Sequence, residues 1–214
     1  DTGKGNNALN FVANFGADST SPGSGTVNYL GSYRFEIKYS EPAGVKVGAN
    51  QPSALMAMNR AIEMISNLKT PYDLDKKAER TTYTVGVGSC TPAPEGERSK
   101  ECTLLVDMRS PTPGPLKDIR SKIEPAFAKA LQQENAKYGL KDGDAKAVKM
   151  ELVWFGDRPA HKRKNYDDPA MQAFWQSART VGIDIREKLN ERAASLNDNV
   201  PAAVGVPTVN FNVG

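Results

Sequence analysis

Four segments of the chain alternate between apolar and polar residues, which is typical of a β-strand with one buried face. Four strands that are polar on one side need a cover on the other side only. The apolar positions of the four segments are, in order, Tyr33, Phe35, Ile37 and Tyr39; Tyr83, Val85 and Val87; Leu104, Val106 and Met108; and Val148, Met150, Leu152 and Trp154.

Two further segments repeat apolar residues every three or four positions and so predict helices. The first begins near Pro52 and ends near Leu68. The second follows PTPGP and runs to about Tyr138, with Pro125 expected to kink or break it. The order strand, helix, strand, strand, helix, strand predicts an α+β fold, a ferredoxin-like four-stranded antiparallel sheet with both helices on one face.

The parts of the chain on either side of this layer have weaker patterns. Residues 1–31 are rich in Gly, Asn and Ser and predict an irregular lead-in. After Pro159 come a polar linker, a helix over about Pro169–Val181 and a short apolar strand in VPTVNFNVG. We therefore divide the chain into a lead-in (1–28), the layer (29–160) and a C-terminal piece (161–214), and expect the outer two to be partial segments of an α/β domain.

Composition narrows the possible functions. The formal net charge is +3, and no basic tract with interleaved aromatic residues is present, which argues against a nucleic-acid partner. No apolar run approaches the roughly 20 residues that span a bilayer, so we expect no membrane partner. One histidine and two cysteines argue against a zinc site built from these residue types alone. His161 lies in the charged run HKRKNYDD, which is typical of a solvated loop rather than a catalytic triad.

The two cysteines lie at the ends of the loop between the second and third predicted strands. If these strands pair in simple antiparallel register, Cys90 and Cys102 fall at the mouth of the loop, which predicts a disulfide. A disulfide favours an exported or periplasmic protein. The alternative is two free thiols in a cytoplasmic protein.

Six motifs occur in the order found in one enzyme family. They are NYLGSYRFEIKY, PSALMAMNRAI, TTYTVGVG, LLVDMRS, ELVWFGDRP and SLNDNVPAAVGVPTVNFNVG. Through them the chain resembles the lid, or dimerisation, domain of the two-zinc exopeptidase and amidohydrolase family that includes carboxypeptidase G, aminoacylase and peptidase T. The resemblance implies a lid inserted into an α/β catalytic domain, a peptide or N-acyl amino acid as substrate, and a homodimer formed through the lid.

The resemblance also implies zinc in the parent enzyme, with two ions per site. Asp1, in DTGKG, matches an acidic zinc ligand of the family, and the other ligands would lie outside this chain. A catalytic zinc needs about three protein ligands. We therefore expect the chain by itself to bind zinc weakly, if at all, and to hydrolyse nothing by that mechanism.

Three residues match substrate-binding positions of the family. Arg109 and Arg158 match arginines that hold substrate carboxylates, and Asn199 matches an asparagine that could line the cleft. The alternatives are a surface ion pair of Arg109 with Asp107, and turn or cap chemistry for Asn199. For Arg158 the alternative is an ordinary structural role without contact to a ligand.

The sequence departs from the family at three places. Val45 replaces a lid histidine that helps polarise the substrate carbonyl, CTPAPEGERSKEC replaces the segment that usually carries a lid asparagine, and Asn197 falls where an aspartate is usual. The sequence thus predicts a fragment of a zinc-dependent peptidase or amidohydrolase. The alternatives are a non-catalytic relative that acts as a peptide-binding or dimerisation module, and a stand-alone ferredoxin-like binding domain.

Overall fold

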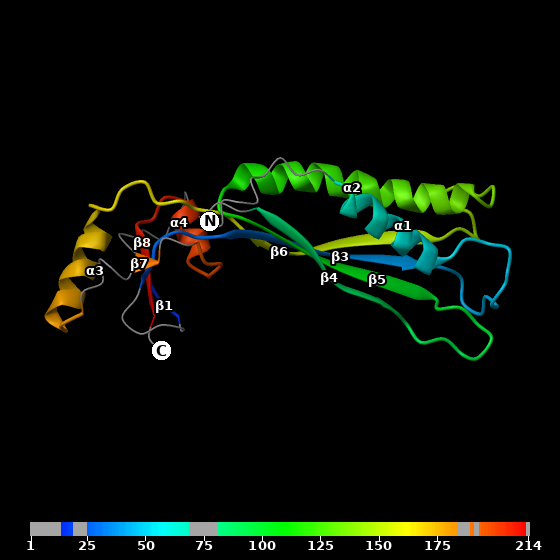
Figure 1. Ribbon diagram of the computed structural model, residues 1–214, viewed down its shortest axis with the longest axis horizontal. Coiled ribbons are helices and arrows are strands. Elements are labelled where there is room, and N and C mark those ends of the chain that lie inside the picture. The colour runs from blue at the N-terminus through cyan, green and yellow to red at the C-terminus, as the bar shows by residue number, and fades with distance from the viewer. Residues whose placement is uncertain (1–13, 19–24, 69–80, 184–188, 191–192, 213–214) are drawn as a thin grey trace, which may run out of the picture.

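The structure is a computed structural model that describes residues 14–18, 25–68, 81–183, 189–190 and 193–212. Two four-stranded sheets organise these residues. The large sheet is formed by β4 (Thr82–Cys90), β5 (Glu101–Ser110), β3 (Gly31–Ser40) and β6 (Lys149–Arg158), in that spatial order. The small sheet lies beyond one end of it (Figure 1) and has the spatial order β1 (Asn14–Asp18), β8 (Thr208–Asn212), β2 (Gly25–Thr26) and β7 (Leu189–Asn190).

All neighbouring strands of the large sheet are antiparallel, and its two helices lie on one face (Figure 1). The helices are α1 (Ala54–Ser66) and α2 (Pro113–Ala136). The predicted ferredoxin-like layer is therefore confirmed. Its predicted register also holds, because Phe35 and Val106 are fully buried beneath the helices and Val85 and Met150 pack against the same core.

Helix α2 continues through Pro125, so the expected break is wrong. A proline inside a helix costs about 3 kcal/mol because it removes a backbone hydrogen bond and crowds the preceding turn. Buried side chains anchor the helix on both sides of that position, with Ile119 and Ile123 before it and Phe127 after it. We attribute the continuity of α2 to this packing.

Strand β4 carries a bulge at Gly86 that the sequence analysis did not anticipate. Val85 lies opposite Val106, whereas Val87 lies opposite Leu105, so β4 has one residue more than β5 over this stretch. The alternation reverses after the bulge, and Val87 is 51% exposed. The expectation that Val87 shares the buried face is wrong.

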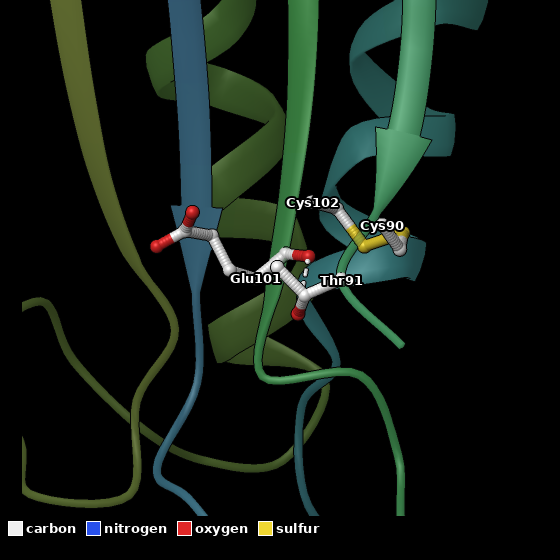
Figure 2. The surroundings of a disulfide bond; sticks show 4 residues. All are labelled: Cys90, Thr91, Glu101 and Cys102. Carbon is white, nitrogen blue, oxygen red and sulfur yellow. Dashed lines mark hydrogen bonds between the residues drawn. A yellow bond between two sulfur atoms is a disulfide. The ribbon is translucent and has the colours of Figure 1, made fainter. Parts of the chain in front are cut away.

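The same bulge sets the position of the disulfide (Figure 2). In the register of Val85 and Val106, Cys90 would lie opposite Glu101. The one-residue shift instead places Cys90 opposite Cys102, with a Cα–Cα distance of 4.0 Å, and the two are joined by a disulfide. Thr91 donates its backbone N–H to the carbonyl of Glu101 at 2.9 Å, so the loop is also closed by a hydrogen bond.

The small sheet consists of short strands and mixes parallel and antiparallel pairs. Two of its strands, β1 and β2, lie within residues 1–31, so the expected irregular lead-in is wrong for these positions. Such strands are too short for alternation to reveal them. The helices of this region are α3 (Pro169–Thr180) and α4 (Asn199–Ala203).

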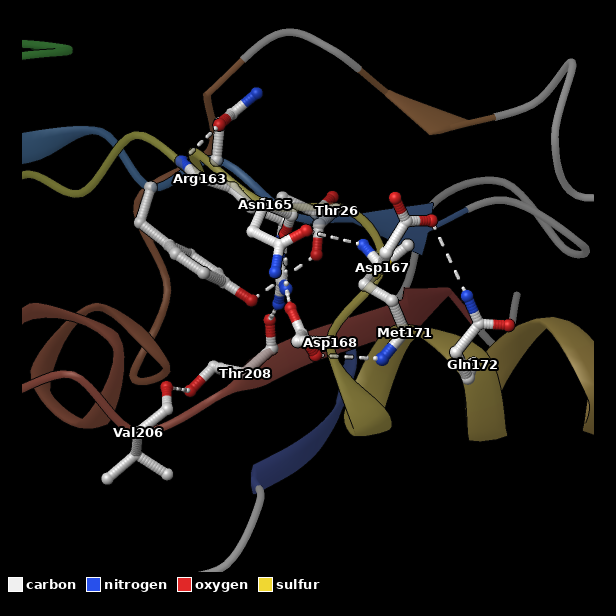
Figure 3. A network of polar contacts seen from close by, with 11 residues as sticks. Thr26, Arg163, Asn165, Asp167, Asp168, Met171, Gln172, Val206 and Thr208 are labelled. Carbon is white, nitrogen blue, oxygen red and sulfur yellow. Dashed lines mark hydrogen bonds and ion pairs between the residues drawn. The ribbon is translucent and has the colours of Figure 1, made fainter.

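A buried arginine ties the segment before α3 to the small sheet (Figure 3). Arg163 donates from its guanidinium to the carboxylate of Asp168 and to the backbone carbonyl of Thr208. Asp168 in turn caps α3 by accepting the backbone N–H of Met171 at 3.0 Å.

Of the helices in the described residues, none is both long and apolar enough to cross a membrane.

Candidate ligand-binding site

Two predicted site residues, Arg109 and Arg158, come together on the face of the large sheet opposite its helices. Ser32 lies opposite Arg109 on one side and opposite Arg158 on the other, so the three side chains form a row across β5, β3 and β6. Residues that lie opposite each other in antiparallel strands point to the same face. Strand β6 extends to Arg158 and thereby places this side chain on the sheet.

A second row beside the first contributes Asp107 and Arg34. Arg34 donates from Nε to Asp107 Oδ2 at 2.7 Å, and Arg109 donates from Nε to Asp107 Oδ1 at 2.7 Å. Burial raises the pKa of Asp107, but hydrogen bonds from Arg109 and Arg34 outweigh that effect and hold the pKa below its usual value. The carboxylate is therefore charged and shared by two guanidinium groups.

We call the group formed by Ser32, Arg34, Asp107, Arg109 and Arg158 the arginine site. It holds three permanently charged guanidinium groups and one carboxylate. One carboxylate cannot neutralise three such groups, so the site favours an anion. Arg34 was missed at the sequence level, although it occupies the polar register of its strand, because only the strand pairing brings it beside Asp107.

The two predicted arginines differ in what they contact. Both Nε and Nη2 of Arg109 donate to Asp107, which is the surface ion pair that the sequence left open as an alternative. Arg158 donates from Nη1 to the carbonyl of Ser195 at 3.2 Å and from Nη2 to Asn197 Oδ1 at 3.4 Å, both neutral acceptors. An incoming carboxylate can displace neutral acceptors more easily than a paired carboxylate, so Arg158 is the better candidate for ligand contact.

Asn199 occupies a different kind of position. It is fully buried, and its Nδ2 donates to the carbonyls of Leu30 and Pro159, each at 2.8 Å. Its Oδ1 accepts the backbone N–H of Leu196 at 2.8 Å. Both amide protons are thus used within the chain, which favours the turn-chemistry alternative over direct substrate contact.

Val45 lies far from the arginine site. It follows the end of β3 at Ser40, whereas the arginine site begins at Ser32 near the other end. The eight-residue separation along an extended strand corresponds to about 25 Å. Val45 is buried in the loop beyond β3, where its carbonyl accepts the backbone N–H of Arg98 at 2.8 Å, so within one chain it cannot share a small ligand with Arg158.

The described residues do not by themselves provide a zinc site. Within them, no group of three His, Cys, Asp or Glu side chains lies close enough together to hold a metal ion. Asp1, the predicted ligand, lies outside the described residues. The guanidinium groups of the arginine site themselves offer anion binding.

A comparison with solved structures relates the fold to a group of hydrolases. Aminopeptidase PepT from Bacillus cereus superposes with a TM-score of 0.65 at 17% identity, over 95% of this chain and 49% of that protein. A Staphylococcus aureus tripeptidase gives 0.62 at 18% identity, over 94% and 49%. The aminobenzoyl-glutamate utilization protein of Klebsiella pneumoniae gives 0.64 at 17%, over 92% and 49%.

The chain has the fold of this peptidase and amidohydrolase family. The family resemblance inferred from the six motifs is thus confirmed at the level of the fold. The chain spans about half the length of these solved structures. No protein-family model matches the chain, and no curated protein matches it.

Proposed function

We propose that the chain is the substrate-binding lid, with adjoining segments, of a metal-dependent peptidase or amidohydrolase, and that Arg158 binds the carboxylate of a peptide or an N-acyl amino acid. The observation that carries the proposal is the row of Arg109, Ser32 and Arg158 on the face of the large sheet opposite its helices. The guanidinium of Arg158 can form a bidentate pair with a carboxylate. Arg109 and Arg34, fixed by Asp107, would supply supporting positive charge.

In this proposal the zinc ions and the residues that hydrolyse the substrate belong to the whole protein. Asp1 would be one of the metal ligands. The described part of the chain would bind and orient the substrate, without catalysing the reaction on its own.

The proposal is tested by comparing ligands that differ only in their charge. Acetylalanine and its uncharged analogue acetylalaninamide are titrated into the full chain and followed by NMR shifts. We expect binding of acetylalanine only, weakened at least about tenfold in Arg158→Gln, because hydrogen bonds between charged groups contribute about 1.5–3 kcal/mol.

Lys38→Gln is the matched control, since Lys38 lies on the same sheet face beside Glu101 at the far end of β3. This variant should bind acetylalanine like the wild type. Equal binding of the amide, or undiminished binding by Arg158→Gln, would rule out carboxylate recognition by Arg158.

The second candidate function is a non-catalytic module that binds peptides or dimerises. The observation in its favour is Val45, because valine cannot donate the hydrogen bond that the matching histidine supplies in the family. The two candidates share the carboxylate-binding role of Arg158. They are separated by peptide hydrolysis in the whole protein loaded with zinc, which only the first candidate requires.

We also propose that two copies of the chain pair through β4 and α1. Strand β4 is an edge strand without a charged residue, whereas β6, the other edge, carries Lys149, Glu151 and Asp157. Charges protect edge strands from pairing, so β4 is the less protected edge. Two exposed apolar residues of the helix α1, Leu55 and Met56, add to the apolar surface available for this contact.

Sedimentation of two matched variants tests this pairing. Val87 on β4 and Val153 on β6 have similar exposure, 51% and 45%, and neither lies in the core. We expect Val87→Lys to shift the protein from dimer to monomer and Val153→Lys to leave it dimeric. A monomeric wild type at high concentration would contradict the proposal.

For the location, we propose export or a periplasmic site, supported by the disulfide between Cys90 and Cys102, because disulfides persist mainly in oxidising compartments. A cytoplasmic location is the alternative. Fractionation of the source cells, with the thiol state of both cysteines measured in each fraction, distinguishes the two.

A further inference from the structure

The described chain passes between the two sheets at two places. One crossing joins β2 to β3 through residues 27–30, and the other leaves β6 at Pro159 and leads to α3. The crossings run side by side, because the backbone N–H of Tyr29 donates to the carbonyl of His161 at 2.8 Å and His161 returns a hydrogen bond at 2.9 Å. They are also close together at Gly31. Any side chain at this position would bring its Cβ within 2.7 Å of the backbone nitrogen of Ala160, so only glycine fits without a shift.

A third segment, residues 194–199, lies against both crossings. The carbonyl of Ala194 accepts the backbone N–H of Leu30 at 2.7 Å, and the backbone N–H of Ala194 donates to the carbonyl of Asn28 at 3.2 Å. The same segment accepts both hydrogen bonds of Arg158, at Ser195 and Asn197. It therefore contacts the first crossing and the arginine site at once.

Asn199 is the residue of this segment that binds both crossings with one side chain. One amide group donates to Leu30 in the first crossing and to Pro159 in the second, each at 2.8 Å. Leu30 and Pro159 adjoin the large sheet, directly before Gly31 and directly after Arg158. Any rotation of the large sheet about these crossings would have to break or stretch at least one of the two hydrogen bonds.

We propose that Asn199 is a positioning residue that fixes the orientation of the large sheet, and with it the arginine site, relative to the small sheet. The proposal does not depend on the proposed function, since it concerns the geometry of the two sheets only. It assigns Asn199 a role that differs from the substrate contact its family match implies. The role follows from two donated bonds in a fully buried position.

The test measures the distance between the two parts of the molecule. Nitroxide labels are placed at Lys129→Cys on α2 and Ser177→Cys on α3, two exposed positions, and the distance distribution is recorded by double electron–electron resonance in the full chain. We expect a single narrow distance in the otherwise unmodified protein. Asn199→Ala should broaden and shift this distribution, because both crossings lose a hydrogen bond.

Asn135→Ala is the matched control. Asn135 is also buried, and its amide also bridges backbone groups, donating to the carbonyl of Val148 at 3.0 Å and accepting the N–H of Val148 at 2.9 Å. All these contacts lie within the large-sheet region. This variant should lose stability without changing the distance between the labels.

A narrow, unchanged distribution in folded Asn199→Ala would overturn the proposal, as would a broad distribution in the protein with Asn199 intact. If Asn199→Ala does not fold, Asn199→Ser decides in the same way. Its hydroxyl can donate to only one carbonyl at a time, so broadening supports the proposal and an unchanged narrow distance overturns it.

Discussion

The two sheet regions of this protein are stabilised in different ways. The large sheet has ten-residue central strands and a continuous apolar core beneath α1 and α2. The small sheet has strands of two to five residues, and its buried apolar cluster among the described residues comprises Val27, Ala170, Met171, Phe174, Ala178 and Val209. Buried polar groups such as Arg163 and Asn199 supplement that cluster.

The difference teaches that one chain can combine a region ordered by apolar burial with one that depends on a few specific polar contacts. Apolar burial is roughly proportional to the area removed from water and tolerates small changes of shape. A buried polar contact is lost as a whole when one partner is removed.

Introducing a buried carboxylate into each core should break the two regions separately. Val106→Asp should unfold the large-sheet region, because a buried unpaired carboxylate costs several kcal/mol and Val106 is fully buried. Val209→Asp should disrupt the small sheet while the large sheet still melts cooperatively. Thermal melts followed by circular dichroism, with hydrogen exchange to locate the loss, check both. A Val106→Asp protein that is soluble and melts cooperatively would contradict the assigned core.

Removing Arg163 should destabilise the small-sheet region by about 3–5 kcal/mol, the range found when one partner of a buried ion pair is lost. The variant is Arg163→Met, which leaves the carboxylate of Asp168 without its buried partner. Lys122→Met is the control, since the Lys122–Asp118 pair is exposed and should contribute less than about 1 kcal/mol. Urea unfolding of both variants gives the comparison, and similar losses would contradict it.

Removing the disulfide should cost the large-sheet region roughly 3 kcal/mol in the loop-entropy model, because the bond closes a short loop in the unfolded chain. The double variant Cys90→Ala, Cys102→Ala is compared with the wild type by thermal unfolding. Intact mass before and after reduction gives an independent check. If reduction does not add two hydrogens, the thiols are free in solution and the proposed oxidising compartment loses its support.

The smallest expected effect concerns Asp107. Its pKa is lower in the folded protein than in the unfolded chain, so its pairing with Arg109 and Arg34 stabilises the fold above the ordinary carboxyl pKa. This contribution is lost as the pH falls through the lowered pKa. Asp107→Asn should therefore flatten part of the acid limb of a stability–pH curve, modestly because the pair is partly exposed. An unchanged acid limb would contradict the role of this carboxylate.

Local sequence patterns were sufficient to predict the large sheet. Apart from the bulge in β4 and the irregularity between β3 and β6, its strands alternate between apolar and polar residues. A one-residue slip in register would turn the whole buried face of a strand to solvent, so the pattern itself restricts the pairing. The bulge at Gly86 escaped prediction because one extra residue in a strand changes the pairing register but leaves no mark on the composition of the strand. The continuity of α2 through Pro125 escaped because packing on both sides of the proline outweighed its local cost.

The site was predicted less completely than the fold. Motif matches singled out Arg109, Arg158 and Asn199. Arg34 lies within the first motif but matched no substrate-binding position there, and it joined the site only through its position opposite Asp107. The short strands β1, β2 and β7 left no periodic signal. Their pairing depends on contacts between segments that are far apart in the chain.

The sequence by itself thus predicted the strands and helices of the large sheet and most of its buried positions, because the periodicity of apolar residues is a property of neighbours along the chain. The disulfide was also predicted, but only the tertiary structure decided the one-residue shift that sets Cys90 opposite Cys102, that Asp107 pairs with both Arg34 and Arg109, and that Asn199 binds both crossings. These contacts join residues that lie from a few to more than a hundred positions apart. Whether they form depends on register and orientation, to which a hydrogen bond or a disulfide is sensitive within a fraction of an ångström.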